Sequence, residues 1–591
     1  MNKVNYSFTR LILRIIPMQF RALPKQTIVF ILINVINSLS ITAGIIATQR
    51  LFDAITHAAS GHLDFGGCVI PLLVMTILVF WQNVVDGIHD FYSTVVREKS
   101  SAIIRTMLHK KLQYIEPEKF EDTIFLDSLN KAKEGILPLT TICFTLISLL
   151  FFEGLYFFSV GMYLFNLNPI LMITLILAFI PALLLQVVRV KIFTKLEKQS
   201  APLRREYEYY KKTLCDREYY KETRILGAFK FLYKLFNNTL FLLIRYQWKA
   251  ERKIALLQLA LNLFTFVGMG MSSYLLFVST MSGEITVGAF AAVFSALGQI
   301  FNIMFGMFQW ELGNINRNIG KVANFVFLMD MPGRTGVEDT YDFTKGIVAE
   351  NISFTYPGKD KPAVCDVSLS IADGETIAIV GENGAGKSTL VRLLIGLYCP
   401  SKGKIIVAGM DTMLTVPSAI YKGISGVFQK YQRYKMTLGE NVTISNAEDV
   451  LNESRVEEVL KKASVEFEYD DVGLGTMLSP EFNGIDLSGG QWQRLAIARG
   501  LYRENGFIVL DEPTAAIDPI EETNIYTQFK QLSIGKCAIV VTHRLGSTKL
   551  AHRIVVMDDG KIVDTGTHDE LLSRPGKYAD MWNSQAQWYK R

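Results

Sequence analysis

The chain has 591 residues and a net charge of +5, from 61 lysines and arginines against 56 aspartates and glutamates. This near balance argues against a polybasic nucleic-acid binder and against an acidic disordered tail. Half of the residues are hydrophobic and only 20% are charged, below the roughly 25% of soluble domains. Collagen-like and disordered chains are therefore excluded, and a membrane protein with a large soluble part is favoured. The six cysteines are scattered without paired spacing, so neither a disulfide framework nor a zinc site is predicted.

The first 26 residues carry five basic side chains and no acidic one. Apolar residues recur there at helical spacing with basic residues between them. This pattern predicts an amphipathic helix along the inner membrane surface, and the alternative is a soluble lead-in. Arg10 and Arg14 interrupt the apolar positions, and no small-residue cleavage site follows them, so a cleavable signal peptide is not expected.

Six apolar stretches before about residue 310 are each long enough to span a bilayer, which takes about 20 helical residues. One such stretch alone is compatible with a buried core helix, but six in succession argue against that alternative. We place the spans at residues 27–48, 69–90, 139–163, 169–190, 254–279 and 286–308.

The loops predict the orientation of these spans. Residues 91–138 and 191–253 are long and basic, whereas the three other loops are short and hold a single Lys or Arg, Arg50. Basic loops are cytoplasmic, so both termini are expected in the cytoplasm. Loops of this length without internal structure are unusual. We therefore expect the membrane helices to continue into the cytoplasm and to turn back there.

Three polar residues within the spans are candidates for a substrate cavity. Glu153 lies in the middle of the third span, where an ionisable group is costly and therefore a functional hypothesis by default. It is expected either to contact a cationic peptide or drug or to pair within the bundle. Gln299 and Asn302 on the sixth span are further candidates for the cavity lining.

From residue 347 onward, short apolar strands alternate with helices, which is typical of a mostly parallel α/β domain. The segment Gly381–Thr389, Gly-Glu-Asn-Gly-Ala-Gly-Lys-Ser-Thr, follows the predicted strand Ile377–Val380 and precedes a predicted helix. This is the context of a phosphate-binding P-loop. Glycines let backbone amides crowd around phosphate oxygens, Lys387 can reach the β- and γ-phosphates, and the Ser388 hydroxyl can bind Mg²⁺.

Two more segments fit nucleotide chemistry. The strand that ends at Asp511 places a carboxylate for the Mg²⁺ shell, and Glu512 follows where it can polarise an attacking water. Leu487–Gln491, Leu-Ser-Gly-Gly-Gln, opens a predicted helix and can form a second phosphate nest. A single ATP does not need two phosphate nests from the same chain. If two chains meet head to tail, however, each chain caps the nucleotide of the other, and both nests are used.

These motifs identify the chain as similar to the half-transporters of the ATP-binding-cassette (ABC) exporters. The resemblance implies an α-helical transmembrane domain of six spans fused to an α/β P-loop ABC nucleotide-binding domain. Its boundaries are expected at residues 1–335, with a linker at 336–346 and the ATP-binding domain at 347–591. Coupling helices are expected near residues 118–130 and 213–224.

The resemblance also assigns roles to matching residues. Tyr356 resembles the aromatic residue that stacks on adenine, Gln429 the Q-loop glutamine that meets Mg²⁺, and His543 the switch histidine that contacts the γ-phosphate. Residues 515–518 occupy the place of the D-loop. The implied catalytic residues are Glu512 and His543, and the implied Mg²⁺ ligands are Ser388, Gln429 and Asp511. The implied ATP-binding residues are Tyr356, Gly381, Gly384, Gly386, Lys387, Ser388, Thr389, Gln429, Ser488, Gly489, Gly490, Gln491 and Asp511.

The chain departs from the usual exporter sequence at several positions, and these departures point to one group of exporters. Before the signature the chain reads Ser-Pro-Glu-Phe-Asn-Gly, and only Glu481 and Gly484 correspond to the usual exporter sequence. The D-loop reads Ala-Ala-Ile-Asp, and the combination resembles bacterial exporters of lantibiotics and other modified peptides. ATP-driven export of a peptide or amphipathic compound across a bacterial plasma membrane is therefore expected. The alternatives are multidrug or lipid-linked cargo, and import of siderophore- or cobalamin-type ligands. ATP and Mg²⁺ are the implied cofactors, and a homodimer is expected, with a heterodimer as the alternative.

Overall fold

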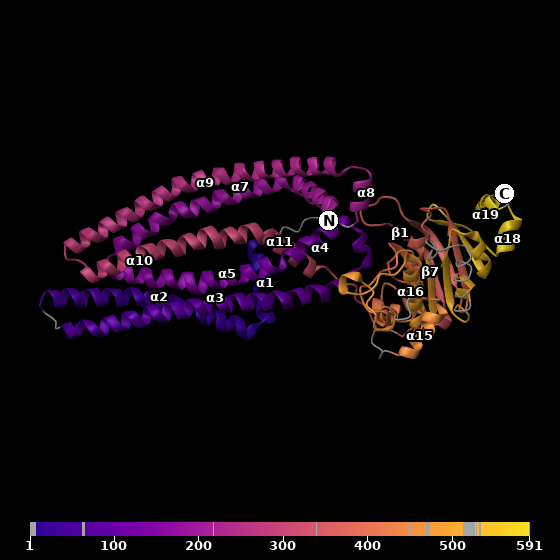
Figure 1. Ribbon diagram of the computed structural model, residues 1–591, viewed down its shortest axis with the longest axis horizontal. Coiled ribbons are helices and arrows are strands. Elements are labelled where there is room, and N and C mark those ends of the chain that lie inside the picture. Colours follow the sequence, from indigo (N-terminus) through magenta and orange to yellow (C-terminus); the bar gives the residue numbers. More distant parts are fainter. Residues whose placement is uncertain are drawn as a thin grey trace. The chain divides into compact units, whose positions relative to one another are not determined.

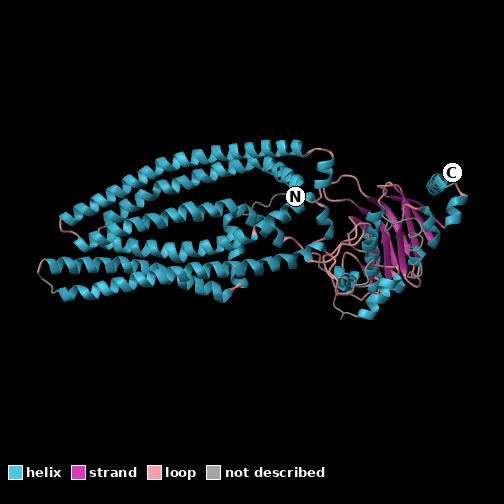
Figure 2. Cartoon of the chain, viewed as in Figure 1, coloured by secondary structure: helices cyan, strands magenta, loops and turns pink. Residues whose placement is uncertain are grey.

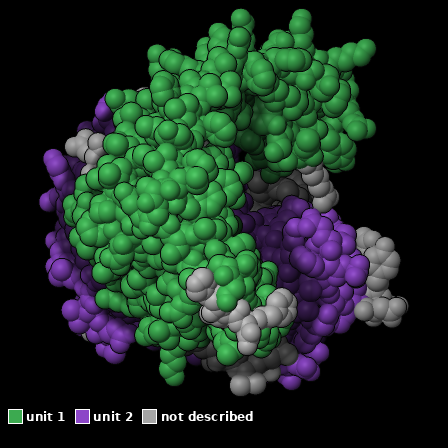
Figure 3. Space-filling model, turned by 90° about the vertical axis from the view of Figure 1, so that its left-hand side faces the viewer, with its two compact units in different colours: residues 1–110, 128–330 green, residues 111–127, 331–591 purple. Residues whose placement is uncertain are grey.

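The computed structural model describes residues 7–61, 65–216, 218–338, 340–447, 452–467, 472–511, 526–527, 529–530 and 533–589. The chain divides into two compact units, one of residues 1–110 and 128–330 and the other of residues 111–127 and 331–591. Figure 3 colours the two units separately. Each unit is described below by itself.

The first unit is built from long helices, and six helical segments are long and apolar enough to cross a membrane. The six predicted spans are thereby confirmed as apolar helices. They run over Pro24–Ala59, Gly66–Leu112, Ile136–Leu167, Pro169–Phe193, Phe229–Met281 and Val287–Asp330. The elements of this half are α1 (Phe8–Ala22), α2 (Pro24–Ala59), α3 (Val69–Leu112), α4 (Thr123–Glu134), α5 (Ile136–Ser148), α6 (Gly154–Leu167), α7 (Pro169–Cys215), α8 (Tyr220–Ile225), α9 (Phe229–Met281), α10 (Val287–Gly306) and α11 (Gly313–Asp330).

Two of these spans contain a short π-helical segment in the middle of otherwise regular helix. The segment η3 (Leu149–Glu153) separates α5 from α6, and η4 (Met307–Leu312) separates α10 from α11. The sequence analysis did not predict either segment. Each adds a residue to one helical turn and changes the direction in which the following side chains point.

Small and polar residues set the helix packing in this unit. The helices α7 and α9 run side by side (Figure 1), and a Cβ on Gly268 of α9 would lie 2.6 Å from the Cβ of Ala178 on α7. The backbones approach closely there because glycine has no side chain, as is common between membrane helices. Between α2 and α10, the Gly288 amide donates to Asp53 Oδ1 at 3.0 Å.

The predicted N-terminal amphipathic helix is present as α1, and one face of it packs on the bundle. Leu11 and Ile15 are buried there. Gln19 donates to Thr27 Oγ1 at 3.3 Å and accepts from the Ser100 hydroxyl at 2.5 Å. Its position along a membrane surface stays a prediction.

The long loops at residues 91–138 and 191–253 are largely helical, as expected from their length, and their cytoplasmic location stays a prediction. The helices α3, α7 and α9 extend well beyond a 20-residue membrane core. The first expected coupling segment consists of two elements, a 3₁₀-helix η2 (Pro117–Glu121) and α4, because Asp122 Oδ1 accepts from the Ile124 amide at 2.8 Å and begins a new helix. The second expected segment contains the short helix α8.

The second unit is an α/β domain with two sheets. Five strands of its larger sheet pair in parallel in the order β9-β3-β8-β7-β6, and β10 adds an antiparallel edge. The smaller sheet is antiparallel, in the order β2-β1-β4-β5. The strands are β1 (Ile347–Phe354), β2 (Val364–Ile371), β3 (Thr376–Gly381), β4 (Lys402–Val407), β5 (Met410–Asp411), β6 (Ile424–Val427), β7 (Phe507–Asp511), β8 (Cys537–Val541), β9 (Arg553–Asp558) and β10 (Lys561–Gly566).

Helices pack around these strands (Figure 2). The buried apolar residues form separate clusters, two of which contain helices that begin at predicted motifs. The helix α12 (Lys387–Leu394) packs into one hydrophobic cluster with β1 to β4, whereas α16 (Gly489–Tyr502) packs into a second cluster with α14 and α15. The other helices are α13 (Pro417–Lys422), α14 (Leu438–Thr443), α15 (Glu453–Lys462), α18 (His568–Ser573) and α19 (Lys577–Tyr589).

Candidate functional site

The P-loop lies between the buried strand β3 and the helix α12. Gly386 has φ of +96°, and a Cβ there would lie 2.4 Å from the Ala363 carbonyl oxygen. Any side chain at this position would therefore be strained and would collide with the backbone. The glycine allows the chain to turn sharply into α12, so that the amides at the start of the helix stay open toward an anion.

The start of α12 lies close to the C-terminal end of β7. Lys387 and Ser388 begin this helix, and Asp511 ends the strand. The Lys387 ammonium donates to the Gly381 and Glu382 carbonyl oxygens, both at 3.0 Å, and its side chain folds back over the loop. The Ser388 hydroxyl donates to Asp511 Oδ1 at 3.3 Å, and Asp511 is only 5% exposed. The structure therefore brings together two of the three predicted Mg²⁺ ligands. A hydroxyl and a carboxylate are hard oxygen donors of the kind that Mg²⁺ takes together with phosphates and water.

His543 follows β8 and is half-buried near the same carboxylate. Burial lowers the pKa of His543, nearby Lys387 lowers it further, and Asp511 opposes both effects. The His543 carbonyl oxygen accepts from Gln585 Nε2 at 2.5 Å, which ties this turn to α19. Glu512 and the predicted D-loop, residues 515–518, lie outside the described residues. Gln429 is exposed after β6.

Tyr356 reaches the P-loop helix through its hydroxyl. That hydroxyl is hydrogen-bonded to Thr389 Oγ1 at 3.0 Å and accepts from Arg392 at 3.2 Å. Arg392 also donates to the Tyr398 hydroxyl at 3.1 Å. The sequence analysis missed Arg392 and Tyr398, because no short motif marks either residue.

The same network continues to η2, which belongs to the same compact unit. The Tyr398 hydroxyl donates to Glu121 Oε1 at 2.9 Å, and Arg392 lies 3.5 Å from the same oxygen. The neighbouring Glu118 is partly buried, and this burial raises its pKa, although a hydrogen bond from the Cys399 backbone lowers it. A continuous set of hydrogen bonds therefore joins η2 to the P-loop helix.

The signature segment forms the N-terminus of α16. The Ser488 hydroxyl accepts from the Gln491 amide and the Gln491 side chain accepts from the Ser488 amide, which makes a complete capping box. A Cβ on Gly489 or Gly490 would meet open space, so the first turn is unobstructed. Because α12 and α16 pack into different hydrophobic clusters, the P-loop and the signature belong to separate parts of the domain.

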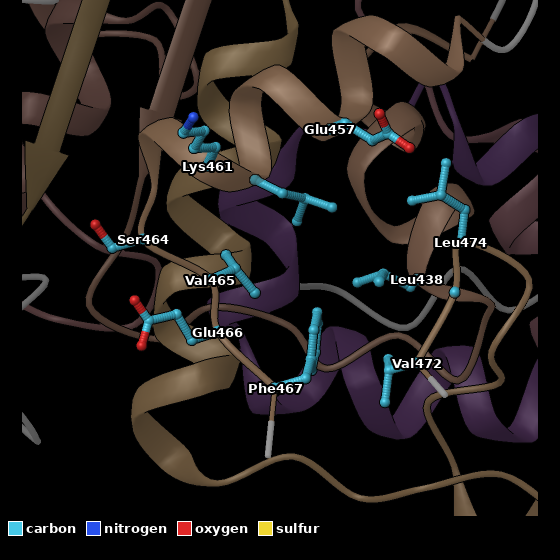
Figure 4. Close-up of a pocket in the computed structure, with 11 residues that line it drawn as sticks. Leu438, Glu457, Lys461, Ser464, Val465, Glu466, Phe467, Val472 and Leu474 are labelled. Atoms are coloured by element: carbon cyan, nitrogen blue, oxygen red, sulfur yellow. The ribbon is translucent and has the colours of Figure 1, made fainter. Parts of the chain in front are cut away.

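A pocket of about 400 Å³ lies beside the signature helix (Figure 4). Figure 4 shows Leu438, Val465 and Phe467 turned toward one another, whereas Lys461 and Glu466 point away. No predicted nucleotide-binding residue lines this pocket.

In the first unit, Glu153 is 4% exposed at the end of η3. Its carboxyl group is hydrogen-bonded to that of Glu311 in η4, and both expectations for Glu153, cargo contact and pairing within the bundle, stay predictions. Glu311 was not predicted. Gln299 is half-buried and Asn302 is exposed, both on α10.

Comparison with known proteins identifies the second half of the chain and the overall fold. Residues 364–515 match the family model described as ABC transporter. The chain also aligns with a solved structure of a bacterial Atm1-family ABC exporter with ATP bound, at a TM-score of 0.81 and 22% identity, over 95% of this chain and 99% of the other. The chain contains an ABC transporter domain and has the fold of an ABC exporter. The predicted fold class, six apolar helices followed by an ABC domain, is therefore confirmed.

Named relatives of this ABC transporter include bacterial peptide and lipid transport proteins. It is 28% identical over 538 residues to the subtilin transport ATP-binding protein of Bacillus subtilis. This alignment covers 86% of this chain and 83% of that protein. It is 33% identical over 319 residues to the nisin transport ATP-binding protein of Lactococcus lactis subsp. lactis, 53% of each chain. It is 33% identical over 318 residues to the ATP-dependent lipid A-core flippase of Photobacterium profundum, 52% of each.

These findings establish the general activity. The transporter is a multi-pass membrane protein whose ABC domain uses ATP, and its ATPase activity is coupled to transport.

Proposed function

We propose that the transporter uses ATP to export a modified peptide or a related amphipathic compound across the bacterial plasma membrane. The observation that carries this proposal is the length of the alignment with the subtilin transport protein. At 538 residues it is longer than either half of the chain, so the likeness includes membrane spans. The spans are the part of a transporter that contacts cargo, so a relative that shares them is informative about cargo.

Lipid-linked cargo is the second candidate. The lipid A-core flippases of Escherichia coli strain K12 and Photobacterium profundum are 36% and 33% identical to the chain over 244 and 318 residues. Alignments of that length are compatible with a likeness centred on the ATP-binding domain. They support a lipid substrate less strongly than the longer alignment supports a peptide.

The ATP site follows from the P-loop geometry. Lys387 would exchange its two carbonyl partners for β- and γ-phosphate oxygens, and the amides of Gly384 and Gly386 would donate to the same phosphates. Ser388, Asp511 and Gln429 would hold Mg²⁺, which neutralises phosphate charge when it is bound. Tyr356 would support the adenine.

Hydrolysis needs a base and a γ-phosphate contact. We assign Glu512 to orient and polarise the attacking water and His543 to the γ-phosphate. The signature residues Ser488 and Gln491 and the glycines between them would bind the nucleotide of a second chain. Two copies of this chain then supply two complete sites. A heterodimer is the alternative.

The test is transport into inside-out vesicles that contain the purified transporter, in which uptake corresponds to export. We expect ATP-dependent uptake of a lanthipeptide precursor, and no uptake by Glu512→Gln. Uptake of a labelled lipid in place of the peptide would support the second candidate. ATP-dependent loss of preloaded ligand from these vesicles would show import and would overturn the proposal.

A further inference from the structure

The two π-helical segments each place a glutamate inside the bundle. Glu153 is the last residue of η3, and Glu311 lies near the end of η4. Single-turn π segments within helices are rare and occur frequently at functional sites, because they redirect side chains at the cost of regular hydrogen bonding. Here both segments turn a carboxyl group toward the same place.

The two carboxyl groups contact each other rather than a cation. They are hydrogen-bonded to each other, and among the described residues neither forms an ion pair. Arg189 lies three residues beyond Gln186 on α7, and its interactions include Arg317, Glu251 and the Phe193 ring. A hydrogen bond between two carboxyl groups requires that at least one of them keeps its proton, because a carboxylate can only accept. The pair therefore carries at most one negative charge, and a cation beside it stabilises the form that carries this charge.

Gln186 supplies a third polar group from α7. Its Nε2 donates to the Phe308 carbonyl oxygen in η4 at 2.6 Å, and the side chain is 8% exposed. This bond uses the donor end of the amide. Its Oε1 is buried with no hydrogen-bond partner among the described residues.

The unsatisfied atoms of this cluster are all acceptors. Glu153 Oε2, Glu311 Oε2 and Gln186 Oε1 are buried and lack a partner within the described part of the chain. A buried acceptor without a donor is costly, and a buried negative charge without a counter-charge is more costly still. A ligand that satisfies all three must donate hydrogen bonds, and a ligand with positive charge also stabilises the ionised form of the pair.

We propose that Glu153, Glu311 and Gln186 form a binding site within the membrane-spanning half for an ammonium or guanidinium group of the transported molecule. An organic cation is favoured over a small metal ion because Phe152 and Phe308 flank the glutamates in sequence and are packed in the bundle, and aromatic rings attract organic cations. That the cation belongs to cargo rests on the proposed export function. Binding of the cation at this site does not depend on that function.

The test measures binding without nucleotide, with the full transporter in lipid nanodiscs. The two probes are radiolabelled dodecylamine, which is cationic, and N-dodecylacetamide, its neutral analogue. Empty nanodiscs correct for partition into lipid. The variant that removes the charge carries both Glu153→Gln and Glu311→Gln, because a single glutamine leaves the other glutamate able to ionise. Glu153→Gln alone keeps one carboxyl group and retains the charge. The matched control is Asp90→Asn, since Asp90 lies on α3 with a side chain that is 88% exposed.

We expect saturable binding of dodecylamine to the wild type and to Asp90→Asn. The dissociation constant should rise at least about tenfold in the double glutamine variant, because a charge-assisted hydrogen bond is lost. Glu153→Gln alone should bind more tightly than the double variant, which excludes general misfolding as the cause. Binding of N-dodecylacetamide should be equal in all variants.

Two results would overturn the site. One is no saturable binding of dodecylamine to the wild type, and the other is binding to the double glutamine variant within twofold of the wild type. Either result, together with ATP-dependent export in vesicles, would leave the proposed function intact. Charge-dependent binding without export would leave the site intact and refute the function instead.

Discussion

At the scale of single residues, Lys387 donates to two backbone carbonyl groups of the P-loop. Its side chain is 5% exposed, and its ammonium has the Gly381 and Glu382 oxygens at 3.0 Å. These contacts hold the ammonium beside the loop whose amides are expected to bind phosphate. Lys387→Met keeps much of the buried stem but removes the charge. We expect its affinity for a fluorescent ATP analogue to fall at least tenfold, about 1.4 kcal/mol.

A suitable control for that measurement is Lys361→Met, because Lys361 is 73% exposed and pairs with Asp559. It should bind nucleotide like the wild type. Equal affinity of Lys387→Met and the wild type would contradict the assignment of Lys387 to the phosphates.

His543 makes stability depend on pH in a defined direction. Burial and then Lys387 lower the pKa of His543 in the folded protein, against the opposing effect of Asp511. An unfolded histidine is protonated near its ordinary pKa of about 6.5, so the unfolded state binds more protons. The free energy of unfolding should therefore decrease as the pH falls below that value. His543→Gln should lose less thermal stability than the wild type between about pH 7.5 and 5.5. Equal losses in the two proteins would contradict this cause.

At the scale of elements, the 3₁₀-helix η2 and the P-loop helix α12 are joined by side chains. Tyr398 and Arg392 both contact Glu121 on η2, and Arg392 contacts Tyr356, which bonds Thr389 on α12. Tyr398→Phe removes the hydrogen bond to Glu121 and leaves the ring stacked on Phe354. We expect basal ATPase activity within about twofold of the wild type and a reduced ratio of transported cargo to hydrolysed ATP, since one hydrogen bond contributes about 1 kcal/mol.

Tyr421→Phe provides the control for this prediction. Tyr421 is also a partly buried tyrosine, and its hydroxyl donates to the Gly396 carbonyl oxygen at 3.4 Å instead of to η2. It should leave the transport ratio unchanged. If Tyr398→Phe transports as many molecules per ATP as the wild type, these hydrogen bonds do not couple the two elements.

Local patterns in the sequence predicted the elements but not the contacts between distant residues. The spans follow from runs of apolar residues, and the P-loop from glycines between a strand and a helix. In contrast, Arg334 lies at the end of the expected transmembrane domain, residues 1–335, and no sequence motif marks it. It is 8% exposed, and its guanidinium donates to the Gly396 and Thr412 carbonyl oxygens.

The pairing of Glu153 with Glu311 shows why such contacts escape prediction. The two residues are far apart in the sequence, and each is placed by a π-helical segment whose extra residue shifts the helical phase. A regular period of 3.6 residues assigns the wrong face beyond such a segment. Glu153 was predicted as a costly charge within a span, but the sequence gives no sign that Glu311 is its partner, and only the folded structure shows this contact.

At the scale of the whole molecule, the P-loop and the signature segment begin helices that pack into different hydrophobic clusters. The P-loop begins α12 over one hydrophobic cluster, and the Ser488 capping box begins α16 over another. An open helix N-terminus with unobstructed glycines is suited to bind phosphate. If two chains associate head to tail, the signature of each closes the nucleotide of the other.

Mixed dimers distinguish this arrangement from two independent sites. Lys387→Ala disables the P-loop, and Ser488→Arg blocks the signature, so homodimers of either variant should be inactive. In a mixed dimer with shared sites, one site contains both defects and the other contains none. Purification through two different tags should therefore yield a mixed dimer with measurable ATPase activity. If each site belonged to one chain, the mixed dimer would be as inactive as the two homodimers, because each chain would carry its own defect.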